Sequence, residues 1–95
     1  MLHGYIDIPT IHFFKEKNIW TGSAFDRFNY KIMPVKSDEK SELHCVIWYG
    51  KKNYDLVDSN EYVYDFHEEL SAEGLEIVIE KINKAVEEYK NKQLF

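Results

Sequence analysis

Residues 71–92, SAEGLEIVIEKINKAVEEYKNK, decide the fold because they carry the clearest hydrophobic pattern in the chain. Their apolar side chains recur at intervals of three and four, which places them in one stripe along an α-helix. Ser71 is a typical N-cap residue, and Lys90 and Lys92 lie near the C-terminus, where cations are favoured. The segment therefore predicts an amphipathic helix over 71–92, in which Gly74 costs about 1 kcal/mol relative to alanine. The predicted stripe consists of Leu75, Val78, Ile79, Ile82, Ala85, Val86 and Tyr89.

Three upstream segments alternate apolar and polar residues with a period of two, which is typical of half-buried strands. The first covers 27–32, and we expect Pro34 to end it. The second covers 42–49 and becomes apolar on both sides in its C-terminal half, so we expect it to be the central strand. The third covers 61–66, with an acidic side that faces outward. The inward-facing residues are Phe28, Tyr30, Ile32, Leu43, Cys45, Ile47, Tyr49, Tyr62, Tyr64 and Phe66.

Short polar connections join these segments, at 36–41 and at the glycine-containing turn 50–53. Sequential strands with short connections predict an antiparallel meander. The 95 residues therefore form one α+β domain with two layers, a three- or four-stranded antiparallel sheet at 25–66 covered by the C-terminal helix at 71–92. Residues 1–24 are ambiguous: they are extended before Pro9 and resemble a short helix between Ile11 and Lys17.

Negative charge is concentrated in the middle of the chain. Residues 53–80 contain nine carboxylates and no lysine or arginine, whereas the flanks 1–52 and 81–95 each carry a formal charge of +2. The net charge of −5 therefore comes from this region, and we expect a folded acidic face that favours a cationic partner. The nine are Asp55, Asp58, Glu61, Asp65, Glu68, Glu69, Glu73, Glu76 and Glu80.

The composition also bears on location. Cys45 is the single cysteine, so no disulfide can form within the chain and a reducing compartment is expected. The longest apolar stretch, Cys45 to Tyr49, is five residues, which is too short for a membrane span or the apolar core of a signal peptide. We therefore expect a soluble, cytoplasmic protein that does not contact membranes.

No residue set predicts a catalytic, cofactor or metal site. His67 begins a sequence similar to the zinc motif H-E-x-x-H, but Ser71 stands where the second histidine is required. The four histidines are widely separated, and the neighbours His44 and Cys45 should face opposite sides of their strand. The segment starting at Asp55 fails the calcium-loop pattern, and the four isolated glycines exclude phosphate-binding loops. Scattered lysines beside this acidic region argue against direct nucleic-acid binding.

An aromatic surplus remains. Val46 and Trp48 lie on the outer side of the central strand and need cover, which Phe13, Phe14 and Trp20 could supply. Otherwise an exposed aromatic patch beside carboxylates would form a protein-binding site. The residues predicted to bind the partner are Trp48, Asp58, Glu61, Tyr62, Tyr64 and Asp65.

Five short blocks resemble, in this order, a group of short uncharacterised bacterial proteins: Trp20–Ser23, Phe28–Ile32, Val46–Gly50, Phe66 and Ser71–Leu75. Some members of this group are automatically labelled as acetyltransferases. The resemblance extends over residues 20–90 and implies a two-layer α+β domain. The acetyltransferase label implies acyl transfer from coenzyme A.

Three functional hypotheses follow. The first is a small non-catalytic domain, monomeric or homodimeric, that binds a protein partner through its acidic, aromatic-rich side; a basic nucleic-acid-binding protein is one such partner. The second is an acidic inhibitor that mimics nucleic acid, as phage anti-defence proteins do. The third is an acetyltransferase-like enzyme, which predicts coenzyme A binding.

Overall fold

The computed structural model describes residues 2–3, 6–24, 27–36, 39–50 and 56–93. Predicted features that lie outside these ranges include Tyr5 in the segment expected to be extended before Pro9, residues 37–38 of the first connection, residues 51–53 of the turn, and Asp55. The elements, in chain order, are β1 (Leu2–His3), β2 (Ile6–Asp7), α1 (Ile11–Lys15), β3 (Trp20–Ala24), β4 (Phe28–Lys36), β5 (Ser41–Tyr49), the 3₁₀ turn η2 (Ser59–Glu61), β6 (Tyr64–Glu69) and α2 (Ala72–Gln93).

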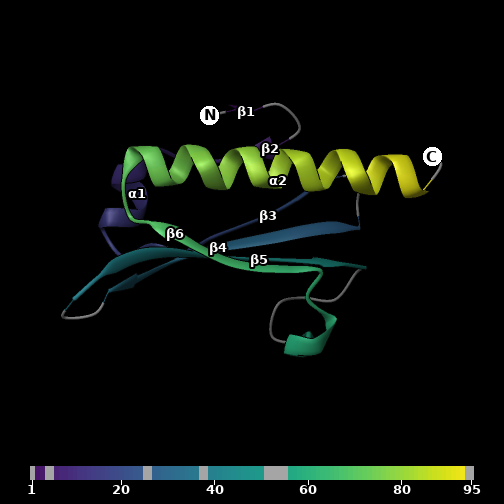
Figure 1. Cartoon of the computed structure of the whole chain (residues 1–95), viewed down its shortest axis with the longest axis horizontal. Coiled ribbons are helices and arrows are strands. Elements are labelled where there is room, and N and C mark those ends of the chain that lie inside the picture. The colour runs from purple at the N-terminus through teal and green to yellow at the C-terminus, as the bar shows by residue number, and fades with distance from the viewer. Residues whose placement is uncertain (1, 4–5, 25–26, 37–38, 51–55, 94–95) are drawn as a thin grey trace.

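The main sheet has four antiparallel strands in the order β3-β4-β5-β6, so each strand pairs with its neighbour in sequence. α2 lies along one face of this sheet, and the short β1–β2 pair lies beside the helix (Figure 1). The predicted two-layer α+β meander is therefore confirmed. Its fourth strand is β3, which falls within the segment 1–24 that the sequence left ambiguous.

α2 begins as its sequence predicts. The hydroxyl oxygen of Ser71 accepts a hydrogen bond from the backbone N–H of Gly74 at 3.0 Å, which satisfies a donor that the first turn leaves open. The predicted stripe faces the sheet: Val78, Ile82 and Val86 have no exposed surface. Burying each such side chain contributes about 1.5–3 kcal/mol, so this stripe attaches the helix layer to the sheet.

The N-terminal segment contributes to the same core, on the helix side of the sheet. Ile6, Ile8 and Phe14 are buried in it, and the backbone carbonyl of Asp7 accepts hydrogen bonds from Trp20 Nε1 at 2.9 Å and from the Tyr30 hydroxyl at 3.0 Å. Both donors lie in the main sheet, on β3 and β4. These two hydrogen bonds fix the N-terminal segment against the β3–β4 side of the sheet, opposite the β6 edge.

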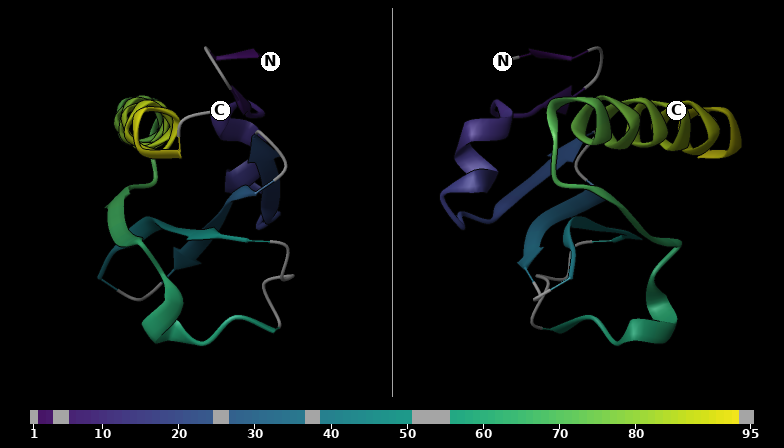
Figure 2. Two further views of the ribbon diagram at one scale, coloured as in Figure 1. Left: turned by 90° about the vertical axis from the view of Figure 1, so that its right-hand side faces the viewer. Right: turned by 60° about the vertical axis from the view of Figure 1, so that its left-hand side comes forward.

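The aromatic residues of this segment do not cover the outer side of β5, so that expectation is wrong. Phe13 and Trp20 make an edge-to-face contact, with ring centroids 5.8 Å apart, and pack against the core beneath α2. Val46 and Trp48 are nevertheless buried, at 0% and 2% exposure. The segment 56–63, which contains η2, lies on their side of the sheet (Figures 1 and 2).

Two strand boundaries differ from the prediction. β4 continues through Pro34 to Lys36, because among the described residues β3 pairs with β4 only as far as Ile32. Beyond that point, a proline can occupy β4 without removing a bond to β3. β6 covers Tyr64–Glu69 rather than 61–66, because its polar residues find cross-strand partners: His67 lies opposite His44. Glu61 belongs to η2 instead.

Among the described residues, no helix combines the length and the apolar character that a membrane crossing requires.

We expect Gly74→Ala to destabilise the protein, although alanine is the better helix former. A Cβ at position 74 would overlap the backbone carbonyl of Glu69, so the end of β6 would have to shift. Overpacking of this kind costs about 1–3 kcal/mol. Chemical denaturation measures the loss, and Ala72→Gly, at the exposed start of the same helix, provides the control with a loss below about 1 kcal/mol. A Gly74→Ala protein that is more stable than the wild type would contradict the close packing described here.

Candidate functional site

The predicted partner-binding residues occupy different environments. Asp58 and Glu61 are exposed at η2, where the Asp58 N–H donates a hydrogen bond to Glu61 Oε2 at 2.9 Å. Tyr62 is half-buried, and Trp48 is 2% exposed. The ring of Trp48 is therefore part of the interior, and a surface anchor must come from other apolar residues.

Tyr64 and Asp65 lie on opposite faces of β6. Tyr64 faces α2, as its hydrogen bond to Glu88 shows, whereas Asp65 faces away from the helix, beside His44. Because side chains alternate along a strand, these two residues belong to two different surfaces. The structure thus divides the predicted set into a helix side and an outer side.

The carboxylates are also divided between the two layers, so the prediction of a single acidic face is wrong in part. Glu73, Glu76 and Glu80 are exposed on α2, whereas Asp65 projects from the outer face of the sheet. Lys81 Nζ donates a hydrogen bond to Glu68 Oε2 at 2.5 Å, so a cation from the C-terminal flank offsets the charge of Glu68. The sequence could not show this division, because it depends on which strand and helix faces meet.

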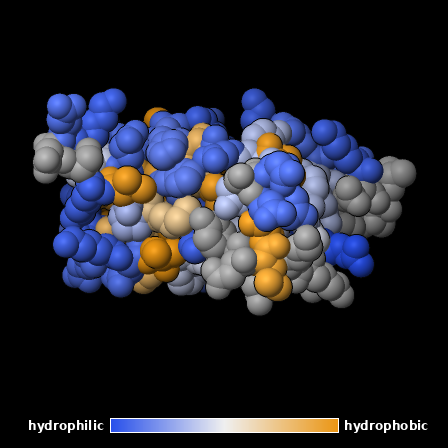
Figure 3. All heavy atoms as spheres, turned by 90° about the horizontal axis from the view of Figure 1, so that it is seen from below, coloured by the Kyte–Doolittle hydropathy of each residue, from blue (hydrophilic) through white to orange (hydrophobic). Residues whose placement is uncertain are grey.

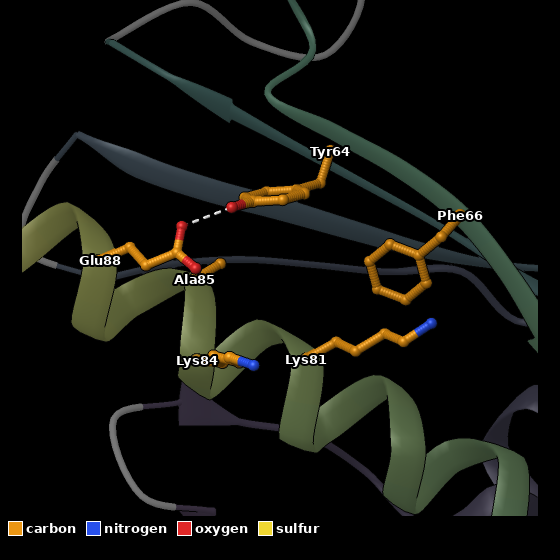
Figure 4. A pocket seen from close by; sticks show the side chains of 6 residues that line it. All are labelled: Tyr64, Phe66, Lys81, Lys84, Ala85 and Glu88. Carbon is orange, nitrogen blue, oxygen red and sulfur yellow. Dashed lines mark hydrogen bonds between the residues drawn. The ribbon is translucent and has the colours of Figure 1, made fainter.

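A groove of about 300 Å³ separates β6 from α2 (Figure 4). Tyr64 and Phe66 enter it from β6, and the Lys81 ammonium lies 4.8 Å from the centre of the Phe66 ring. The Tyr64 hydroxyl donates a hydrogen bond to Glu88 Oε2 at 2.5 Å. The side chains that line the groove are Tyr64, Phe66, Lys81, Lys84, Ala85 and Glu88.

The bond to Glu88 changes the acidity of Tyr64. Because the phenol must keep its proton to donate to the carboxylate, this hydrogen bond raises the pKa of Tyr64 to about 12, with smaller contributions from burial and from the negative charge of Glu88. The tyrosine therefore remains a neutral donor that joins β6 to α2 throughout the neutral pH range.

The outer side of the sheet carries exposed apolar residues next to carboxylates. Leu56 is 66% exposed and Val63 is 41% exposed, on the same segment as the exposed Asp58 and Glu61. Seen from this side, hydrophobic side chains form separate patches within a mostly hydrophilic surface (Figure 3). We call the exposed residues Leu56, Asp58, Glu61, Val63 and Asp65 the η2 surface.

A second polar cluster lies on the outer face of β5 and β6. His44 and His67 are directly opposite each other in the ladder, and their rings stack with centroids 4.2 Å apart and planes 3° apart. His44 Nε2 lies 2.6 Å from Asp65 Oδ1. One ligand atom from each of the three residues can be chosen so that all lie within 4.8 Å of one another.

Sequence reasoning missed this cluster because 23 positions separate the two histidines and the third strand was predicted to end at Phe66. A signal was nevertheless present. His44 and Asp65 were both predicted to face outward, and extending the same alternation by two residues places His67 beside them. The site was missed because the third strand was predicted to end at Phe66, although His44 and Asp65 were assigned to the correct face.

Cys45 takes no part in this cluster. It is buried on the helix side of β5, which confirms that His44 and Cys45 face opposite ways. Burial raises the pKa of the Cys45 thiol, with a further increase from the charge of Asp65. The thiol therefore stays protonated and behaves as a small apolar core residue.

Comparison of the chain with protein-family models, with curated proteins and with solved structures found no match. The resemblance to short bacterial proteins therefore stays a prediction.

We expect Glu88→Gln to lower the pKa of Tyr64 from about 12 towards the ordinary value of 10. The raised pKa means that this bond stabilises the folded state fully below pH 10, and that its contribution is lost as the pH rises from 10 to about 12. Spectrophotometric titration of tyrosinate, with Tyr64→Phe identifying the signal, measures the shift. Glu80→Gln, an exposed glutamate on the same helix, is the matched control. An unchanged Tyr64 titration in Glu88→Gln would contradict the assignment.

Proposed function

We propose that this chain is a small protein-interaction domain that acts by binding rather than by catalysis, and that the η2 surface is its binding site. The observation that carries the proposal is the combination, on one short segment, of strongly exposed apolar side chains with carboxylates. Leu56 at 66% exposure is the most exposed large hydrophobic residue of the described chain. Exposed apolar groups surrounded by polar ones are typical of interaction sites.

The charge of the η2 surface defines the chemistry of the partner. Residues 56–65 contain three carboxylates, Asp58, Glu61 and Asp65, and no lysine or arginine. A partner that fits would present lysines or arginines around an apolar recess that receives Leu56 and Val63. The carboxylates would then steer the approach of the partner, and the apolar contacts would supply most of the affinity.

The proposal keeps the carboxylates expected from the sequence and replaces their aromatic anchors. Trp48 is buried, and Tyr64 is engaged with Glu88 on the helix side, so Leu56 and Val63 take the anchoring role. The protonated, buried thiol of Cys45 supports a binding role over nucleophilic catalysis, and it also fits a cytoplasmic location.

A second proposal rests on the other layer. Glu73, Glu76 and Glu80 form an exposed row of carboxylates along α2, a helix of 22 residues. Such a row can imitate the phosphates of a nucleic acid and occupy a basic channel, so an acidic inhibitor remains the alternative. The two proposals use different faces of the molecule and are separable by mutation.

We expect the double variant Leu56→Ser/Val63→Ser and the double variant Asp58→Asn/Glu61→Gln each to weaken binding of a captured protein partner. Capture from a lysate of the source cells, followed by titration with the purified partner, provides the measurement. Loss of two exposed charges corresponds to about a tenfold increase in Kd, since each exposed ion pair contributes roughly 0.2–1 kcal/mol. Loss of the apolar pair has a larger effect because it removes the anchor.

The triple variant Glu73→Gln/Glu76→Gln/Glu80→Gln serves as the matched control. If only this variant loses binding, and binding falls steeply with added salt, the inhibitor alternative replaces the proposal. A thermal shift on adding coenzyme A would favour the acetyltransferase hypothesis instead. A partner whose binding survives both η2 variants would refute the proposed surface.

A further inference from the structure

We propose that His44, Asp65 and His67 form a binding site for a divalent transition-metal ion, with Zn²⁺ as the reference ion. This site shares Asp65 with the η2 surface, but both of its histidines lie outside that surface, so variants of the histidines test metal binding separately from the proposed protein interaction. Two imidazoles and one carboxylate on a solvent-facing sheet form the donor set of zinc sites that use three protein ligands and leave a fourth position open.

The backbone of two paired strands fixes the three ligands. His44 is on β5, where it lies directly opposite His67 on β6, and Asp65 precedes His67 by two residues on the same face. β5 is flanked by strands on both sides, so its position is determined by two ladders. Residues directly opposite across an antiparallel pair have Cβ atoms about 4.5–5.5 Å apart, within reach of one shared ion.

The ligand atoms of the three side chains already lie close together. Their nearest ligand atoms all lie within 4.8 Å of one another, whereas Zn–N and Zn–O bonds of about 2.0–2.2 Å place tetrahedral ligand atoms about 3.3 Å apart. Coordination would require the parallel rings of His44 and His67 to rotate out of their stack, so that one nitrogen of each ring points at the ion. His44 Nε2 and Asp65 Oδ1, now 2.6 Å apart in a hydrogen bond, would move apart to about 3.3 Å as the ion replaces the proton between them.

The surroundings of the cluster favour a cation. Glu42 and Glu69 lie directly opposite each other in the next outward-facing pair of the same ladder, and carboxylates in that arrangement repel each other. A nearby divalent ion would offset this repulsion. An open pocket of about 570 Å³ includes Glu42, His67 and Glu69 in its lining, together with Lys40, so it reaches one of the three proposed ligands.

The donor types select the metal. Imidazole nitrogen is favoured by Zn²⁺, Co²⁺, Ni²⁺ and Cu²⁺, whereas Ca²⁺ and Mg²⁺ prefer sites built of oxygen alone. The His44 side chain is 24% exposed and the Asp65 side chain is 47% exposed, so an ion can enter and a water molecule or an external ligand can complete its coordination. Bound in this way, the ion would join β5 to β6.

The test uses tag-free protein treated with a chelator and then titrated with Zn²⁺ by calorimetry and with Co²⁺ by visible spectroscopy. We expect one equivalent of each ion to bind, Co²⁺ to give the absorption of a low-coordinate site with nitrogen ligands, and Zn²⁺ to raise Tm. His44→Gln and His67→Gln should each weaken Zn²⁺ binding by more than about 100-fold, beyond the effect of losing an outer-shell partner. Mg²⁺ should produce no signal.

His12→Gln is the matched control, since His12 is exposed on α1, outside the cluster, and this variant should bind Zn²⁺ as the wild type does. Circular dichroism checks that each variant is folded. Imidazole NMR of the wild type decides the case if a cluster variant does not fold: Zn²⁺ should shift the resonances of His44 and His67 and leave those of His12 unchanged. Absence of one-equivalent binding, or binding that persists in both cluster variants, would overturn the proposal.

Discussion

Burial of β5 on both of its faces is the constraint on which the rest of the structure depends. Leu43, Cys45 and Ile47 are fully buried beneath α2, and Val46 and Trp48 are buried on the opposite side. A slip of one residue in either ladder would turn every side chain of a neighbouring strand to the wrong face. The hydrophobic contacts of β5 therefore fix the registers of β4 and β6, and with them the position of every polar cluster.

Local patterns were sufficient to predict the parts of the fold that repeat regularly. The stripe of α2, its Ser71 cap and the alternation of β4 and β5 are properties of neighbouring residues, so the sequence alone shows them. β3 was missed because its sequence, WTGSA, is short and lacks a clear apolar alternation; its place depends on pairing with β4 and on the crossing of Tyr30 over Gly22. Pairing of this kind is not visible in a local pattern.

The candidate sites show the same limit. Exposure of Asp58, Glu61 and Asp65 followed from their charge, but the burial of Trp48 depended on cover that comes from outside its own strand. Glycine at position 74 was interpreted as a weak point of the helix, whereas its closeness to the Glu69 backbone makes it a packing requirement. In each case, the missing information was the identity of a neighbour distant in sequence.

β6 contributes side chains to both faces of the sheet. It is an edge strand that pairs, among the described residues, with β5 alone. Such a strand needs support from side chains, and α2 provides it on one face through the contacts of Tyr64 with Glu88 and of Phe66 and Glu68 with Lys81. These contacts alternate along the strand with Asp65 and His67, which face the other way. Contacts with α2 thus fix the backbone of β6 on its inner face. The fixed backbone in turn positions the Asp65 carboxylate and the His67 imidazole on the outer face. Polar groups on the outer face can therefore be positioned for binding without being buried themselves.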